Sequence, residues 1–158
     1  MAEVSIRILM IRELVEPEHQ LFHHRINSCS YNLDRNFLSK TLVENMIHYN
    51  GIGISANQIG IWERAFSMIR DLEHNEIMVC FNPRIIKLYN EEVEMEEGCL
   101  SYPDLFLKVK RPDKIIVKYE DVDKKTHKMK LEGLASRVFQ HEYDHMEGID
   151  FTQRKVNK

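Results

Sequence analysis

Apolar residues before residue 50 recur at helical spacing, at Leu38, Leu42, Met46 and Ile47. Positions three or four residues apart share one face of a helix, so this pattern predicts a helix over residues 39–49. Ser39 is a candidate N-cap, and Asn50 with Gly51 forms a stop signal. The next segment, residues 51–60, is rich in glycine and predicts a loop whose backbone comes close to another group.

A second helical pattern lies near the end of the sequence, over residues 134–146. Leu134 and Val138 are four residues apart, so they share one face of this helix, and one of two later histidines lies close to them. Gly148 predicts the end of the helix, because glycine is the usual residue just after a helix C-terminus.

Between the two predicted helices, apolar residues alternate with polar ones, which is the pattern of half-buried strands. The predicted strands are residues 64–70, 77–81, 84–89, 106–110, 115–119 and 126–132, the last of them at an edge. The Asn-Pro pair at 82–83 predicts a break, residues 101–104 predict a turn, and the acidic run 91–98 predicts a solvated segment. This order of elements predicts an α+β fold, with mostly antiparallel sheets packed around the helix 134–146.

Length and composition predict a single domain over residues 1–158. Hydrophobic residues are 43% of the chain and charged residues 30%, so we expect an ordered core that needs no oligomeric partner, and hence a monomer. The formal net charge of −3 argues against nucleic acid as a partner. Cys29, Cys80 and Cys99 are too few for a disulfide framework, so we expect a reducing compartment, the cytoplasm.

No segment has the pattern of a signal peptide or a membrane span. Residues 1–20 lack an apolar core and a cleavage site, because Glu3, Arg7 and Arg12 interrupt their short apolar run. The longest uncharged stretch, residues 45–62, is rich in Asn, Gly, Gln and Ser and is too polar to cross a bilayer. We therefore expect no membrane partner.

The sharpest local signal is the sequence His-Glu-Tyr-Asp-His at residues 141–145. On a helix the two histidines lie one above the other, so both imidazoles can hold one metal ion while Glu142 reaches a water bound to it. The alternative is a polar helix face without a metal. Few residues follow His145, and position 151, where one protease pattern needs histidine, is Phe151, so we expect the third ligand upstream.

Cys99 is the best upstream candidate, in the sequence Glu-Gly-Cys-Leu-Ser at residues 97–101. Gly98 lets the backbone turn tightly, and a thiolate with two imidazoles makes a compact site that suits zinc or ferrous iron. A lone cysteine is more often a small buried apolar residue, which is the interpretation we favour for Cys29 and Cys80.

Three segments together resemble the motifs of the peptide deformylase family, which removes the formyl group from the initiator methionine of new chains. The family's Gly-x-Gly-x-Ala-Ala-x-Gln corresponds to residues 51–58, its Glu-Gly-Cys-Leu-Ser to 97–101, and its Gln-His-Glu-x-Asp-His to 140–145. The order and separation of the motifs also match, and the similarity covers residues 38–151. Three motifs in order are a specific signal.

The resemblance implies a metal-dependent hydrolase. Cys99, His141 and His145 would bind one divalent metal ion, for which the resemblance favours Fe²⁺, while Zn²⁺, Ni²⁺ and Co²⁺ also suit these donors. A metal-bound water would attack the formyl carbon, and Glu142 would accept its proton and deliver it to the leaving amine. The products would be formate and a peptide with a free N-terminal methionine.

The resemblance also implies which groups stabilise the negative charge on the formyl oxygen. The side-chain amide of Gln58 and the backbone N–H of Leu100 would donate hydrogen bonds to it. Without the flanking motif, Gln58 would be interpreted as a solvated loop amide, and the side chain of Leu100 as part of the core.

A site for an extended peptide follows from the same resemblance. Backbone groups of Ile52, Gly53 and Gly98 would pair with the peptide as an added strand. The side chains of Ile52, Leu134 and Val138 would line a slot for the methionine. Leu134 and Val138 can also be ordinary core residues, and the two interpretations are compatible.

Three further residues have structural interpretations. By resemblance, Glu97 would pair with Arg111 and brace the Cys99 loop; otherwise Glu97 only ends a solvated acidic run. Asp144 can orient a metal-bound imidazole, bond to backbone or remain exposed on the helix. Ser55 replaces the first alanine of the family motif, so its hydroxyl needs a hydrogen-bond partner.

The partners implied by the resemblance are N-formyl-methionyl peptides and nascent chains. Bacterial members of the family commonly carry a further C-terminal segment used in ribosome docking. This sequence ends soon after the second predicted helix, which puts ribosome docking in doubt. Residues 23–36 do not align with the family pattern.

Two other functions remain possible from the residues alone. The first is a small endopeptidase that uses the same His-Glu-x-x-His motif, against which the position of Cys99 argues. The second is a structural metal site in a binding module. Such a site normally has four protein ligands, and the spare candidates His74, Cys80 and His127 have no metal-ligand spacing.

Overall fold

The computed structural model describes residues 10–157. Residues 1–9, part of the segment expected to lack a signal peptide, lie outside that range. The strands are β1 (Gly53–Ser55), β2 (Ala65–Asp71), β3 (Glu76–Leu88), β4 (Glu92–Cys99), β5 (Tyr102–Pro112), β6 (Lys114–Glu120) and β7 (Thr126–Glu132). The helices are α2 (Arg35–His48) and α3 (Gly133–Met146), with 3-10 turns η1 (Gln20–Phe22), η2 (Ala56–Ile59) and η3 (Phe151–Gln153).

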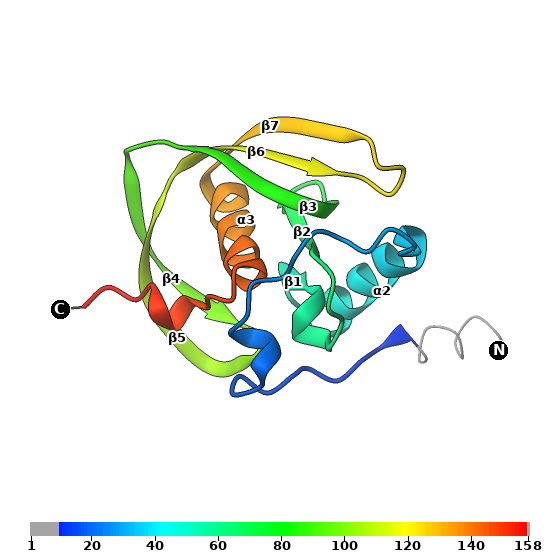
Figure 1. Ribbon diagram of the computed structural model, residues 1–158. Helices are drawn as coiled ribbons and strands as arrows, with labels where there is room; N and C mark the ends of the chain where they lie inside the picture. The colour runs from blue at the N-terminus through cyan, green and yellow to red at the C-terminus, as the bar shows by residue number, and fades with distance from the viewer. Residues whose placement is uncertain (1–9, 158) are drawn as a thin grey trace.

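The strands form two antiparallel sheets. One sheet has the order β1-β2-β3-β6-β7, and β4 and β5 form a second, two-stranded sheet. Figure 1 shows α3 lying between the two sheets and α2 beside β1 and β2. The predicted α+β fold, with antiparallel sheets around the late helix, is confirmed.

The two helices pack on opposite faces of the five-stranded sheet. Phe66 and Met68 of β2 belong to the core under α3. There the rings of Phe66 and Phe139 pack edge to face, with their centroids 5.1 Å apart. Ala65, the neighbour of Phe66, packs with Leu42 of α2 in a second core. This division arises because successive side chains of a strand point to opposite faces.

Helix α2 begins earlier than its apolar pattern predicts. Asp34, and not Ser39, is the N-cap, because its carboxylate accepts a hydrogen bond from the backbone N–H of Phe37 at 3.0 Å. The first turn carries no buried apolar residue before Leu38, so apolar periodicity does not reveal it. Ile47, part of the predicted apolar set, is 56% exposed.

The predicted break at the Asn-Pro pair is wrong, because β3 continues through it. The pairing of β3 with β6 shifts register between Phe81 and Arg84, and Asn82 has a positive φ of 49°. A bulge of this kind admits Pro83, which has no N–H to donate to the ladder.

The acidic run is mostly exposed, as predicted, but it also forms most of β4, a strand that the sequence analysis did not predict. Glu94 lies opposite Lys110 and Glu96 opposite Lys108 in the pairing with β5, so opposite charges face each other across the strands. The predicted loop 51–60 likewise contains β1 and η2.

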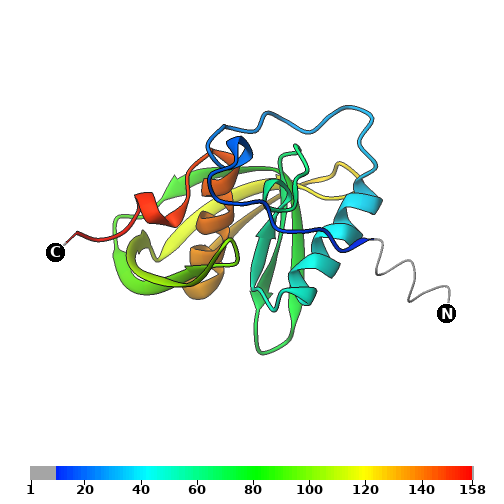
Figure 2. The ribbon, with the colours of Figure 1, turned by 90° about the horizontal axis from the view of Figure 1, so that it is seen from below.

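The segment between η1 and α2 passes beside the end of α3 (Figures 1 and 2). The N–H of Ile26 donates to the carbonyl of Met146 at 2.8 Å. Gly148 has a φ of +74°, and a Cβ there would lie 2.8 Å from the carbonyl carbon of His24. Glycine therefore both ends α3 and leaves room for this crossing segment.

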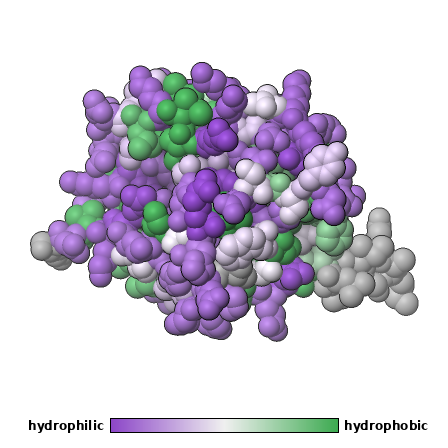
Figure 3. All heavy atoms as spheres, viewed as in Figure 1, coloured by the Kyte–Doolittle hydropathy of each residue, from purple (hydrophilic) through white to green (hydrophobic). Residues whose placement is uncertain are grey.

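The face seen in Figure 3 is mostly hydrophilic, with a hydrophobic group near its upper edge. No helix among residues 10–157 has the length and apolar character needed to cross a membrane.

We expect Ile115→Val to lower the free energy of unfolding by about 0.5–1.5 kcal/mol, because Ile115 is fully buried under α3 and loses one methyl group. Ile47→Val makes the same change at an exposed site and should stay within about 0.5 kcal/mol of wild type. Urea unfolding measures both. Equal losses would contradict the assignment of Ile115 to the core.

Candidate metal centre and active site

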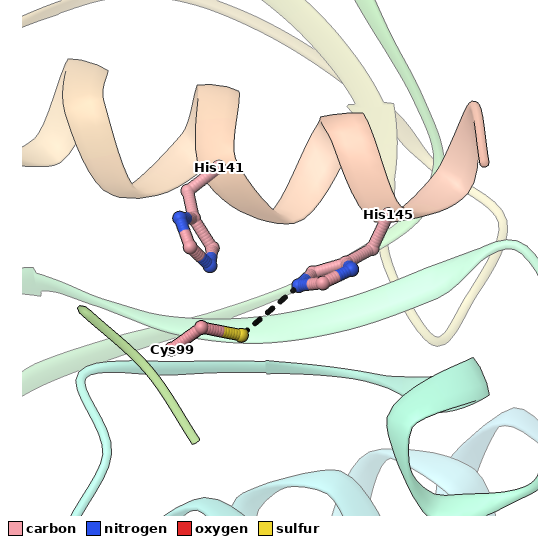
Figure 4. Close-up of side chains that lie close together, drawn as sticks. All are labelled: Cys99, His141 and His145. Carbon is pink, nitrogen blue, oxygen red and sulfur yellow. Dashed lines mark hydrogen bonds between the residues drawn. The ribbon is translucent and has the colours of Figure 1, made fainter. Parts of the chain in front are cut away.

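Three side chains from two elements converge between α3 and the end of β4. His141 and His145 project from successive turns of α3 toward Cys99, the last residue of β4 (Figure 4). One donor atom from each of the three lies within 4.8 Å of the others, and the Cys99 Sγ lies 3.6 Å from the His145 Nε2. These distances bring together residues that are 42 and 46 positions apart in the sequence.

His145 is fully buried, and the ring of Phe22 packs edge-on against it at 5.4 Å. Its Nδ1 has no hydrogen-bond partner among the described residues. Burial lowers the pKa of His145 well below its ordinary value, so the ring is neutral. A neutral imidazole has the nitrogen lone pair that a metal ligand needs.

Glu97 fixes the orientation of the other imidazole. The His141 Nδ1–H donates to the Glu97 Oε1 at 3.0 Å, which leaves Nε2 for the Cys99 side. Burial alone would raise the pKa of Glu97, but hydrogen bonds from His141 and Arg111 lower it to about 2, so the group is a carboxylate. A carboxylate on the far nitrogen is the usual support of a metal-binding histidine.

The site favours positive charge. Burial alone would lower the pKa of His141, but hydrogen bonds with Cys99 and Glu97 raise it to about 10. The same two groups would favour a bound cation. A thiolate and two imidazoles form a ligand set that suits zinc or ferrous iron, so the residues present fit a divalent metal ion.

A buried ion network surrounds Glu97. Arg111 donates to it from Nε at 2.6 Å and from Nη2 at 3.0 Å, as expected, and Arg137 of α3 donates to the same carboxylate. Arg111 also donates to Asp144 at 2.9 Å, and the Arg154 side chain contacts both oxygens of Asp144. Asp144 therefore belongs to this ion network and does not orient His141, whose Nδ1 bonds to Glu97, or His145, whose Nδ1 has no partner among the described residues.

Glu142 faces the groove from α3. Its side chain is 4% exposed, and its Oε2 has no hydrogen-bond partner among the described residues. Burial raises the pKa of Glu142 to about 7, which suits a group that takes up and releases a proton near neutral pH. A Cβ on Gly53 would lie 3.1 Å from the Glu142 Oε1, so glycine lets β1 approach this carboxyl group closely.

Gln58 is buried in η2, and its amide is held in one orientation. Its Oε1 accepts from the backbone N–H of Ser55 at 2.9 Å and from the Ser55 hydroxyl at 3.1 Å. Its Nε2 donates to the Ser101 hydroxyl at 3.0 Å and lies 3.6 Å from the Cys99 sulfur. The donor end of the amide therefore points to the metal centre, and the Ser55 hydroxyl has the partners it requires.

A groove of ≈ 530 Å³ opens beside the three donor atoms. Its walls include most of the residues expected to act on substrate: Ile52, Gly53, Gln58, Gly98, Cys99, Leu100, Leu134, Val138, His141 and Glu142. Val138 is 5% exposed, whereas Ile52 is 42% and Leu134 36% exposed. Val138 lies deep in the wall, and the other two side chains are open to a ligand.

The groove lies between two strands with free edges. Among the described strands, β1 pairs only with β2, and β4 pairs only with β5. Residues of both β1 and β4 line the groove. An extended peptide can add to such edges through backbone hydrogen bonds.

Sequence reasoning missed two groups in this region. Arg137 lies one helical turn before His141, and this i to i+4 spacing was the available signal. The Tyr102 hydroxyl donates to the Asp150 carboxylate at 2.6 Å and ties the turn after Cys99 to the segment after α3. No local pattern in the sequence points to that second contact.

Comparisons with known proteins agree with this geometry. Residues 11–158 match the sequence profile of the family described as polypeptide deformylase. The peptide deformylase of Thermotoga maritima is 42% identical over 115 residues, which cover 71% of this chain and 68% of that protein. Its crystal structure superposes with a TM-score of 0.86 at 33% identity, covering 93% of this chain and 99% of the other.

A second solved structure shares the fold. The peptide deformylase of Synechococcus elongatus in complex with actinonin superposes with a TM-score of 0.87 at 27% identity, covering 93% of this chain and 82% of the other.

We expect Glu97→Gln to weaken metal binding by about 10- to 100-fold, because the amide no longer supplies the negative charge that orients His141. Glu96→Gln changes the adjacent, exposed residue in the same way and should bind metal like wild type. Competition with a chelator measures both affinities. Equal affinities of the two variants would contradict the role of Glu97.

Proposed function

The chain belongs to the polypeptide deformylase family, and from that premise we propose that it removes the N-formyl group from the initiator methionine of nascent polypeptides and releases formate. The observation that carries the proposal is the convergence of three donor atoms beside a groove that Glu142 and Gln58 also face. In this proposal a base and an oxyanion donor would lie next to the same metal centre.

Cys99, His141 and His145 would hold one divalent cation, which when bound supplies an activated water and polarises the formyl carbonyl. We favour ferrous iron from the family resemblance, and zinc, nickel or cobalt are the alternatives that this donor set accepts. Three protein ligands leave a coordination position for water, as a catalytic site requires.

Glu142 would move the proton. Its unpartnered Oε2 would accept a proton from the attacking water, and the same atom would deliver it to the departing amine. Burial raises the pKa of Glu142 to about 7, which supports both halves of this transfer near neutral pH.

Gln58 and Leu100 would stabilise the developing oxyanion. Ser55 holds the Gln58 carbonyl, so the Nε2–H groups are already directed to the site before substrate binds. The backbone N–H of Leu100, which follows Cys99 in the groove wall, would be the second donor. Donors placed in advance need no reorganisation when charge develops.

The peptide would lie between β1 and β4 as an added strand. Backbone groups of Ile52, Gly53 and Gly98 would pair with it, and this proposal is supported by the free edges of both strands. The methionine side chain would enter between Ile52, Leu134 and Val138, which line one groove. We propose that the enzyme works as a monomer in the cytoplasm, on peptides and nascent chains.

Glu142→Gln should lower the rate of formate release from a formyl-methionyl tripeptide by about 100-fold or more, because the amide cannot accept the proton. Its bound metal should remain near wild-type stoichiometry, since the three donor atoms are unchanged. Glu132→Gln, at an exposed position before α3, is the control and should be fully active. Loss of metal together with activity would point to a structural role for Glu142.

Gln58→Glu should lower kcat by about 100-fold, because it keeps the oxygen that accepts from Ser55 but replaces the donating Nε2. Steady-state kinetics with the same tripeptide and the melting temperature of each protein provide the measurements. A kcat equal to wild type would remove Gln58 from the proposed mechanism.

A further inference from the structure

The half of the five-stranded sheet that α2 does not cover carries a concentration of positive charge. Phe81 of β3 packs under α2 and lies opposite Glu120 of β6. Lys118, two residues before Glu120, therefore shares that face of the sheet. Figure 1 shows β3, β6 and β7 running beyond α2, with α3 on their other side.

Strand pairing places cations directly beside one another on this face. Arg84 of β3 lies opposite Lys118 of β6, which lies opposite Lys128 of β7. In the next row, Lys87 and Lys130 lie on either side of Ile116. We call the five basic residues Arg84, Lys87, Lys118, Lys128 and Lys130 the cationic face; all five are exposed.

These charges act together. Neighbouring strands are about 4.8 Å apart, so a row of three cations spans about 10 Å, and the two rows are about 7 Å apart. Both distances are comparable to the screening length of about 8–10 Å at physiological ionic strength. Like charges directly opposite each other destabilise a sheet, so this arrangement does not serve folding.

Few acidic groups neutralise the cationic face. Within residues 10–157, its one ion pair joins Lys130 to Glu132 at 3.3 Å. The ammonium groups of Lys87 and Lys130 lie 4.5 Å and 5.2 Å from the ring centroid of Tyr89. The chain has a net charge of −3, so the face is a local concentration of positive charge on an acidic protein.

Protection of a sheet edge does not explain the whole pattern. Lysines on an edge strand prevent pairing with other chains, and β7 is an edge, so Lys128 and Lys130 fit that role. Arg84 and Lys87 lie beyond Phe81, where the pairing of β3 with β2 ends, so they too are next to an edge. Lys118 lies between Arg84 of β3 and Lys128 of β7, so its charge has no edge to protect.

We propose that the cationic face binds the phosphate backbone of RNA. The phosphate backbone carries one negative charge per nucleotide without interruption, so RNA presents the opposite charge to both rows of cations.

The choice of RNA rests on the proposed function, because a nascent chain is attached to the RNA-rich particle that synthesises it. The cationic face and the groove are separated by the sheet and α3, so bound RNA would leave the groove open to a peptide. The net charge of −3 led us to expect no nucleic-acid partner. Net charge sums acidic and basic residues over the whole chain, whereas strand pairing gathers these five basic residues on one face.

The test is binding of a short, fluorescently labelled RNA hairpin to the full chain, followed by anisotropy over a range of salt concentrations. We expect Lys118→Glu with Lys128→Glu to weaken binding at least about tenfold and to reduce the salt slope by about 1.4 or more, because two phosphate contacts are lost. The matched control, Lys40→Glu with Lys155→Glu, makes the same charge change at exposed positions elsewhere and should bind within about twofold of wild type.

Three outcomes would overturn the inference: no RNA binding by wild type at low salt, equal loss in both double variants, or binding to phosphatidylserine vesicles that RNA does not displace. Formate release from a free formyl-methionyl tripeptide is measured on the same proteins. Both double variants should keep that activity, so a failure of RNA binding is distinguishable from a failure of the proposed enzymatic function.

Discussion

The active site depends on one buried carboxylate. Glu97 holds His141 by its Nδ1, and Arg111 and Arg137 neutralise the same carboxylate from β5 and α3. Removing a carboxylate from water is costly, and the surrounding charged donors offset that cost only while all of them stay in place. The position of the end of β4, and with it the Cys99 sulfur, is therefore coupled to the position of α3. This brace lets two imidazoles and a distant thiol meet at one point.

Local patterns in the sequence predicted much of this fold. The apolar periods of residues 134–146 and 126–132 correspond closely to α3 and β7, because α3 buries one face and alternate residues of β7 are half-buried or buried. The strand β4 was missed in the acidic run, since β4 draws its order from cross-strand partners such as Lys108 and Lys110, which lie elsewhere in the sequence. The bulge at Pro83 is likewise a property of strand pairing.

The sequence motifs predicted the metal-ligand candidates and the groove residues, but they did not predict all the residues that hold these in place. The residues that line the groove came from the family resemblance, and the spacing of the two histidines came from helix geometry. Arg137 and the contact between Tyr102 and Asp150 were missed, because a supporting contact needs only a suitable distance in space. The charge of the cationic face was hidden for a related reason: net charge carries no information on which strands lie together.

The proposed chemistry requires that Cys99, His141 and His145 bind one divalent cation and leave a position for water. X-ray absorption at the metal edge of anaerobically purified protein examines that coordination shell. For the zinc form, we expect one sulfur at about 2.3 Å, two nitrogens at about 2.0–2.1 Å and one oxygen of water. A coordination shell without sulfur, or one closed by four protein ligands, would contradict the proposed chemistry.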